Sequence, residues 1–163
     1  MRTLPLVLAA SAALWFAGTA AASYPDGGGR ARTEPAGFAV PLRGPLESRF
    51  GYRWGRLHAG LDIAVLRTNR VHAADDGVVV ATGWLDGYSG YGNVVRIRHR
   101  PGLVTMYAHL ATIRVRVGQH VARGQLIAGA GCTGSCTGAH LHFEVHVKGK
   151  PVNPLPFLHG RLR

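Results

Sequence analysis

Short alternations of apolar and polar residues run through the chain from Phe38 onward, and they predict β-strands rather than helices. The expected strands are a β-branched run after an Asp-Gly turn and three further short segments: 78–81, 93–99, 103–107 and 113–117. In 113–117 the alternation is strict, which predicts a strand with one solvent-facing side. No window beyond the first 22 residues has a convincing 3.6-residue period, and 23 glycines favour tight turns. The pattern therefore predicts an all-β domain with largely antiparallel strands.

A further strand is predicted at 140–147, where the sequence HLHFEVHV alternates throughout. Because successive side chains point to opposite faces of a strand, four apolar residues share one face. The other face carries His140, His142, Glu144 and His146. The first two imidazoles then lie about 6.5–7 Å apart along the strand, which suits one metal ligand beside one acid–base group. For this motif alone, a hydrophilic strand face without chemistry is the alternative.

Two more histidine motifs bring candidate chemistry from elsewhere in the chain. An extended strand would place His58 and Asp62 about 13 Å apart, so both can bind one ion only if the backbone bends, which Gly60 permits. His109 ends an apolar segment, where a lone histidine is more often packed or capping than catalytic. Two histidines and one carboxylate, with water as a fourth ligand, make a catalytic zinc site. Five histidines are interpreted as surface or structural: His72, His99, His120, His146 and His159.

The beginning of the chain predicts export. Residues 1–22 contain one charge, Arg2, an apolar stretch and a final Ala-Ala-Ala that fits an A-x-A cleavage site, as in a secretory signal peptide. The alternative, a transmembrane anchor, requires about 20 apolar residues. A Gly- and Pro-rich flexible linker is expected at 23–37, the folded domain at 38–157 and a basic tail at 158–163. We expect a periplasmic or secreted protein without a stable membrane span after cleavage.

The formal net charge of +11 favours adsorption to polyanions. Anionic wall polymer, anionic lipid and nucleic acid all qualify, and a solvated basic surface is the plain alternative. Export argues against nucleic acid as the working partner, and no aromatic or helical readout surface for it is evident.

Two cysteines, Cys132 and Cys136, lie four residues apart in a glycine-rich segment. In an exported chain this spacing predicts a disulfide that closes a small ring. The alternative is a zinc site formed by both cysteines and His140, but an exported dithiol tends to oxidise.

Five short motifs occur in one order: SRFGYR at 48–53, HAGLDI at 58–63, YGN at 91–93, YAHL at 107–110 and TGAHLHFE at 137–144. Each is weak alone. Together with GKPVNP at 149–154, the ordered set resembles the lysostaphin-type, or LytM-like, murein endopeptidases, and the likeness runs from about residue 41 to residue 154. The chain departs from the family at 132 and 136, where it has cysteines, and at Ala139, where the family usually has proline.

The resemblance implies a small antiparallel β-sheet or sandwich fold, the duplicated hybrid motif, with few or no helices. It implies one zinc ion per chain on His58, Asp62 and His142, and a catalytic pair, His109 and His140. The activity implied is zinc-dependent hydrolysis of peptide bonds in peptidoglycan. All five residues are present, which favours an enzyme over the family's non-catalytic activators of other wall hydrolases.

Three further expectations concern Glu144, Tyr107 and the segment 117–127. Glu144 is expected either to orient a ring of the site or to form an exposed salt bridge. Tyr107 is expected in the core. Residues 117–127 resemble the strand pair of lipoyl and biotinyl carrier domains, but such carriers need a lysine at a hairpin tip, and no lysine precedes Lys148.

Overall fold

The computed structural model describes residues 37–160 and residue 162. The predicted signal peptide and nearly all of the predicted linker lie outside the described residues. Fifteen strands and two short 3-10 helices make up the described part, which has no α-helix. None of its helices has the length and hydropathy needed to cross a membrane. The prediction of an all-β domain is confirmed.

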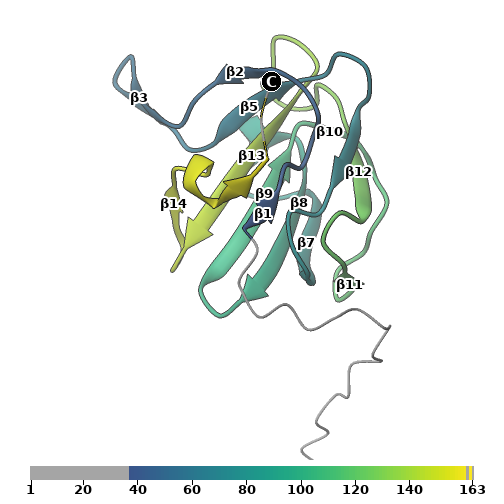
Figure 1. The fold of residues 1–163 in the computed structure, drawn as a ribbon. Helices are drawn as coiled ribbons and strands as arrows, with labels where there is room; N and C mark the ends of the chain where they lie inside the picture. Colours follow the sequence, from purple (N-terminus) through teal and green to yellow (C-terminus); the bar gives the residue numbers. More distant parts are fainter. Residues whose placement is uncertain (1–36, 161, 163) are drawn as a thin grey trace, which may run out of the picture. The chain divides into compact units, whose positions relative to one another are not determined.

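The largest sheet places its strands in the order β11-β7-β8-β9-β13-β5-β2, and β14 also pairs with β13 (Figure 1). All of its pairings are antiparallel. Its strands are β2 (Leu46–Ser48), β5 (Leu61–Ala64), β7 (Gly77–Trp84), β8 (Asn93–Arg100), β9 (Leu103–Ala108), β11 (His120–Val121), β13 (His140–Val147) and β14 (Lys150–Val152).

A smaller antiparallel sheet has the order β10-β12-β6. Its strands are β6 (Arg70–His72), β10 (Leu110–Ile113) and β12 (Leu126–Ala130). Two pairs complete the fold: the hairpin of β3 (Gly51–Arg53) and β4 (Arg56–His58), and the parallel pair of β1 (Phe38–Ala39) and β15 (Leu158–His159). Figure 1 shows the hairpin projecting beside β2 and β5.

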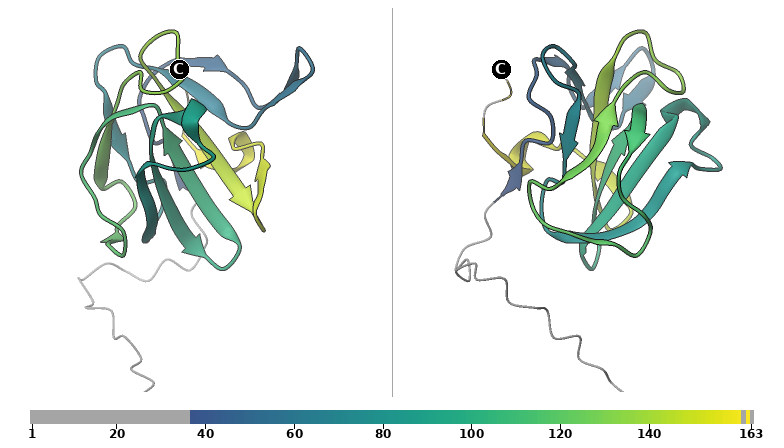
Figure 2. Two further views of the ribbon diagram at one scale, coloured as in Figure 1. Left: turned by 180° about the vertical axis from the view of Figure 1, so that it is seen from behind. Right: turned by 90° about the vertical axis from the view of Figure 1, so that its right-hand side faces the viewer.

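The two sheets share one hydrophobic core, and the small sheet can be followed beside the large one in the turned views (Figure 2). Val71 and Ile127 of the small sheet join the same buried cluster as Ile97, Leu141 and Phe143 of the large sheet. The apolar face of the segment 140–147 is therefore buried as predicted. This burial fixes the register of β13, because a slip of one residue would turn its histidines into the core.

A second, smaller cluster of Val94, Met106 and Ala108 covers the other face of β8 and β9. Tyr88 and Tyr91 pack against it, from the start and end of the 3-10 helix η1 (Ser89–Tyr91). This packing holds η1 next to the end of β9, where His109 follows.

The prediction of a strand over 113–117 is wrong. β10 ends at Ile113, and the chain then crosses from the small sheet to the large one. The Arg114 N–H donates to the Ile127 carbonyl, and the Gly118 N–H donates to the Val79 carbonyl. Val115 is buried in the core between these two points. The strict alternation reflects a crossover with one buried side chain rather than a paired strand.

Candidate metal centre and catalytic site

The backbone between His58 and Asp62 bends as the sequence required. Gly60 stands at the bend with no room for a side chain, since a Cβ there would lie 2.4 Å from the Phe143 carbonyl oxygen. The bend brings His58 Nε2 to 3.1 Å from both carboxylate oxygens of Asp62. These two residues therefore present their polar atoms to the same point.

His142 approaches that point from the neighbouring strand. In the pairing of β13 with β5, His142 lies directly opposite Asp62, and its Nδ1 is 2.7 Å from Asp62 Oδ1. The same nitrogen is 3.3 Å from His58 Nε2. One donor atom from each of the three residues lies within 4.8 Å of the other two, so together they form a possible metal site.

Acceptors behind the two histidines fix which nitrogen faces this site. His58 donates its Nδ1–H to the Arg49 carbonyl at 2.7 Å, and His142 donates its Nε2–H to Glu144 Oε1 at 2.9 Å. The other nitrogen of each ring is left to face Asp62. Metal-binding histidines in proteins are typically held in this way. Two imidazole nitrogens and one carboxylate are a donor set that zinc prefers.

The charges of the site suit a cation. Burial opposes ionisation of Asp62, but hydrogen bonds from His142 and His58 outweigh it and hold the pKa of Asp62 far below its usual value. Burial also disfavours a charged His142, yet the carboxylates of Asp62 and Glu144 raise its pKa to about 9. A divalent cation would take the place of that retained proton, because histidine binds metal in its deprotonated form.

Glu144 is almost completely buried, with 1% of its surface exposed. It bonds to His142 on one side and to His146 Nε2 at 2.5 Å on the other. Burial works against its charge, but these histidines lower its pKa to about 2. Burial and the nearby Glu144 carboxylate raise the pKa of Tyr91. The alternative of an exposed Glu144 salt bridge is therefore wrong, and His146 is a buried structural residue rather than a surface one.

His109 is held between β9 and β10 with a positive φ of 59°, a conformation that few residues other than glycine adopt. Its N–H donates to the Tyr91 carbonyl at 2.9 Å, and its own carbonyl accepts the Gly131 N–H at 2.9 Å. Its Nδ1–H donates to the Thr133 carbonyl at 2.8 Å. Burial lowers the pKa of His109, so at neutral pH its Nε2 is an unprotonated acceptor.

His140 lies beside this ring at the start of β13. The two ring centroids are 4.6 Å apart, and the His109 ring is 5.9 Å from that of His142. His140 donates its Nδ1–H to the Gly138 carbonyl at 2.8 Å, and its Nε2 lies 3.8 Å from Asp62 Oδ1. The structure thus brings together all five residues singled out in the sequence.

Several contributors to the site had no clear signal in the sequence. The backbone carbonyls of Arg49, Thr133 and Gly138 orient three of the four histidine rings. Because every residue has a backbone carbonyl, the residue types at these positions do not indicate that they accept hydrogen bonds from the histidine rings. Arg53 from the projecting hairpin also reaches Asp62, with Nη2 3.8 Å from Oδ2.

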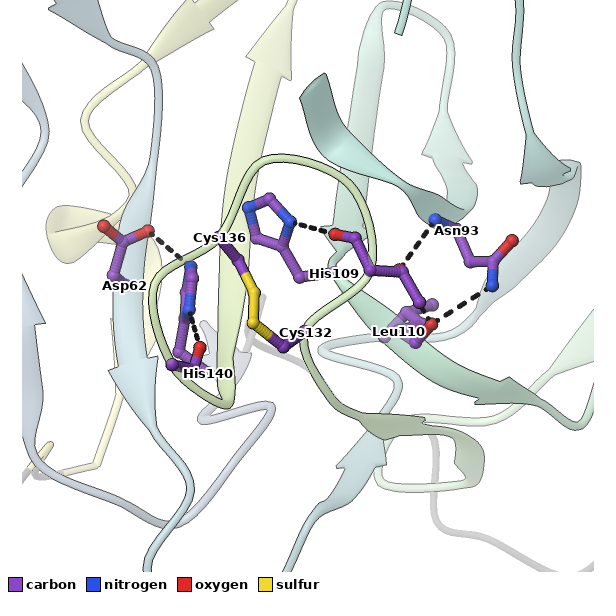
Figure 3. Close-up of a disulfide and its surroundings, with 9 residues drawn as sticks. Asp62, Asn93, His109, Leu110, Cys132, Cys136 and His140 are labelled. Atoms are coloured by element: carbon purple, nitrogen blue, oxygen red, sulfur yellow. Dashed lines mark hydrogen bonds and ion pairs between the residues drawn. A yellow bond between two sulfur atoms is a disulfide. The ribbon is translucent and has the colours of Figure 1, made fainter. Parts of the chain in front are cut away.

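Cys132 and Cys136 form a disulfide, with Cα atoms 5.5 Å apart, which confirms the predicted pairing. Neither cysteine of the described residues is free. The alternative zinc site of two cysteines and His140 is therefore wrong. In Figure 3 the Cys132–Cys136 disulfide lies between the side chains of His109 and His140.

Fold and site define an antiparallel β domain of the metallopeptidase type. The sequence profile of peptidase family M23 matches residues 56–154. The chain belongs to this family, as the ordered motifs predicted.

Three known proteins illustrate the likeness. The chain is 42% identical over 139 residues to the DD-carboxypeptidase/endopeptidase Mpg of Neisseria meningitidis serogroup B, covering 80% of this chain and 31% of Mpg. It is 40% identical over 121 residues to the murein hydrolase activator NlpD of Escherichia coli, covering 74% of this chain and 31% of NlpD. A zinc-containing peptidase from Vibrio cholerae superposes with a TM-score of 0.67 at 36% identity, covering 78% of this chain and 41% of that one. The chain thus spans about a third of the length of the two curated relatives.

Proposed function

We propose that this domain is a zinc-dependent endopeptidase that hydrolyses peptide bonds in bacterial peptidoglycan. One observation carries the proposal: beside the complete trio of His58, Asp62 and His142 stand two more histidines whose Nδ1 atoms are occupied by carbonyls. A purely structural metal site has no use for two such rings. An acyl-transfer site needs them, because a proton must leave the attacking water and another must reach the departing amine.

The five residues divide this chemistry between them. His58, Asp62 and His142 would hold the zinc, which when bound polarises the scissile carbonyl and lowers the pKa of a bound water. His109 accepts the water proton at Nε2, since burial keeps its ring neutral. His140, on the Asp62 side of that ring, acts as the partner that protonates the leaving amine or stabilises the developing oxyanion.

The wall substrate and the export of the protein belong to the same proposal. Mpg is named as a DD-carboxypeptidase/endopeptidase and NlpD as a murein hydrolase activator, and the second name supports peptidoglycan, or murein, as the partner. The basic chain suits an anionic wall, and nucleic acid is not expected as a partner. With residues 1–22 as a cleaved signal, N-terminal sequencing of the exported protein should begin near Ser23, and an N-terminus at Met1 would refute cleavage.

A second function is favoured by one finding, the 40% identity to a murein hydrolase activator. In this case the domain would bind peptidoglycan and stimulate another hydrolase without cleaving the wall itself. The presence of all five site residues supports the enzyme over this alternative.

Digestion of purified peptidoglycan separates the two functions. The zinc-loaded protein should release fragments with new free amino groups and no new reducing sugar ends, and mass spectrometry of these fragments identifies the bond. Protein treated with a chelator should be inactive, and returned zinc should restore activity. If the zinc-loaded protein is inert on every peptidoglycan chemotype but stimulates an amidase, the activator function is correct.

A further inference from the structure

We propose that the bridge loop, residues 131–138 closed by the Cys132–Cys136 disulfide, is the positioning element for both catalytic histidines. The inference rests on the proposed function, because it assigns the loop a task in the same reaction. It concerns turnover and not metal binding. The residues of the loop act through His109 and His140, so they are positioning residues rather than catalytic ones.

Thr133, inside the disulfide ring, anchors His109 in two ways. Its carbonyl accepts the His109 Nδ1–H at 2.8 Å. Its hydroxyl accepts the Asn93 N–H and donates to the Leu110 carbonyl, each at 3.0 Å, and the Asn93 side chain donates to that same carbonyl (Figure 3). Leu110 is the residue after His109. Thr133 therefore ties the loop to the backbone on which His109 sits while its carbonyl selects the tautomer of the ring.

The loop also docks against η1 with almost no clearance. The Ser135 N–H donates to the Gly90 carbonyl at 2.9 Å. Gly92 and Gly134 face each other, both with positive φ, and a Cβ on Gly134 would lie 2.4 Å from the Gly92 nitrogen. A small displacement of this part of the loop would clash with η1 or separate from it, so the position of Thr133 is sensitive to the shape of the ring.

The two ends of the loop meet the other histidine. Gly131 receives the His140 N–H on its carbonyl at 3.0 Å and donates its own N–H to the His109 carbonyl. The Gly138 carbonyl holds His140 Nδ1. One short segment thus supplies the acceptors for the Nδ1 atoms of both catalytic rings and joins their backbones.

The disulfide adds a covalent restraint to these hydrogen bonds. Most of its residues are exposed, including Cys132, Gly134, Ser135 and Gly138, so little buried apolar surface holds it. Glycine-containing segments lose much backbone entropy when they are fixed, and a covalent link reduces that cost. The metal-facing side has its own supports, the Arg49 carbonyl and Glu144, which lie outside the loop. Opening the disulfide should therefore affect the catalytic pair and spare the metal ligands.

The test uses the full zinc-loaded chain and the variant Cys132→Ser/Cys136→Ser. Loss of a group that orients a histidine of a metal site typically lowers activity about 10- to 100-fold. We therefore expect kcat on a peptidoglycan-derived peptide to fall by that factor. KM should change by no more than about twofold, because the lost interaction serves the chemical step. Zinc content should stay at about one ion per chain.

Nitrogen-15 spectra of the imidazoles give a readout independent of activity. In the oxidised wild type, His109 should be the Nδ1–H tautomer, and in the double serine variant it should become a mixture of tautomers. A phosphine reductant should give the same changes in the wild type, because it cleaves the S–S bond with one water: the two protons of the water go to the two thiols, and its oxygen goes to the phosphine oxide. The reductant should change nothing in the double variant.

Thr133→Val provides a second route that leaves the disulfide intact. Valine keeps the shape but loses the hydroxyl that bonds to Asn93 and Leu110, so kcat should fall, whereas Thr133→Ser should keep the wild-type rate. Unchanged kcat and an unchanged His109 tautomer after the disulfide is opened would overturn the inference, and so would loss of zinc in step with activity. If the wild type cleaves no wall peptide, the proposed function fails, while the tautomer measurement still tests the loop.

Discussion

Asp62 and His142 face each other across two paired strands, whereas His109 and His140 occupy strand ends and depend on a loop. The strand pair carries its own side-chain support, because Glu144 lies two residues from His142 on the same face and is buried. The proposed catalytic pair, His109 and His140, is oriented by the carbonyls of Thr133 and Gly138. Asp62 and His142 thus lie on directly paired strands of the large sheet, and the rings proposed to move protons lie beside a loop that a disulfide closes.

The site therefore has two halves that mutations can separate: a strand side, the proposed metal ligands, and a loop side, the proposed catalytic pair. A change on the strand side should remove the metal and everything that depends on it. A change on the loop side should leave the metal in place and reduce the rate of the chemical step.

The largest effect is expected when the trio of proposed metal ligands, His58, Asp62 and His142, loses one member. His58→Ala removes one of the three donors, so the purified protein should retain little zinc and its hydrolysis of the wall should fall to background. Zinc is measured by elemental analysis after exhaustive dialysis. The matched control is His159→Ala, an exposed histidine on β15 outside the large sheet, which should keep the zinc content and activity of the wild type. Full zinc retention in His58→Ala would contradict the ligand assignment.

Next in size is the loss of the loop-held base. His109→Ala should keep about one zinc ion per chain and a wild-type fold. Its wall-lytic rate should drop by about a hundred- to ten-thousandfold, the usual cost of removing a proton-transfer group. Release of free amino groups from peptidoglycan measures the rate, and circular dichroism checks the fold. A variant that digests wall as fast as the wild type would show that His109 transfers no proton.

The strand-held half was the more predictable of the two for a physical reason. In HLHFEVHV the period of two fixes both faces of β13 and puts His140 and His142 on the same one, while the resemblance to the family is what implied His142 and Asp62 as metal ligands. The supports of the loop-held half are backbone carbonyls, whose positions follow from the tertiary fold and not from the residues that carry them.

Two other features of the fold also depend on tertiary structure and could not be predicted from the local sequence. The alternation at 113–117 is indistinguishable from that of a strand, and only the crossover between sheets explains it. The parallel pairing of Phe38–Ala39 with Leu158–His159 joins the two ends of the domain, so no local pattern indicates it.

A milder perturbation on the strand side is Glu144→Gln, which keeps the size of the side chain but removes its charge. The carboxylate accepts from both His142 and His146, and an amide cannot accept equally well from both. Zinc affinity or activity should fall by about 10- to 100-fold, as is typical when the partner of a metal-binding histidine is lost. Competition with a chromophoric chelator measures the affinity. Glu47→Gln, at an exposed position on β2, is the control and should change neither quantity.

The smallest effect is expected away from both halves, at His99, and it tests whether pH acts on the fold independently of the site. His99 donates Nδ1–H to the Asp76 carbonyl at 2.7 Å, and its Nε2 lies 2.8 Å from the Thr105 hydroxyl. Burial lowers the pKa of His99 below its ordinary value of 6.5. The unfolded chain therefore binds a proton at His99 more readily than the folded chain does. The stability that neutral His99 contributes is complete above about pH 6.5 and is lost as the pH falls toward the lowered pKa of the folded state.

Near neutral pH, the free energy of unfolding of His99→Gln should be lower than that of the wild type by about 1 kcal/mol, the usual net value of a lost hydrogen bond. The variant should therefore unfold at a lower urea concentration. The gap between variant and wild type should narrow as the pH is lowered, because protonation weakens only the wild type in this window. Urea unfolding followed by tryptophan fluorescence across this pH range, at a fixed excess of zinc, measures both trends. A gap that stays constant with pH would mean that His99 stabilises the fold by packing against Phe38, whose ring centroid is 5.0 Å away, and not through its neutral hydrogen-bonded form.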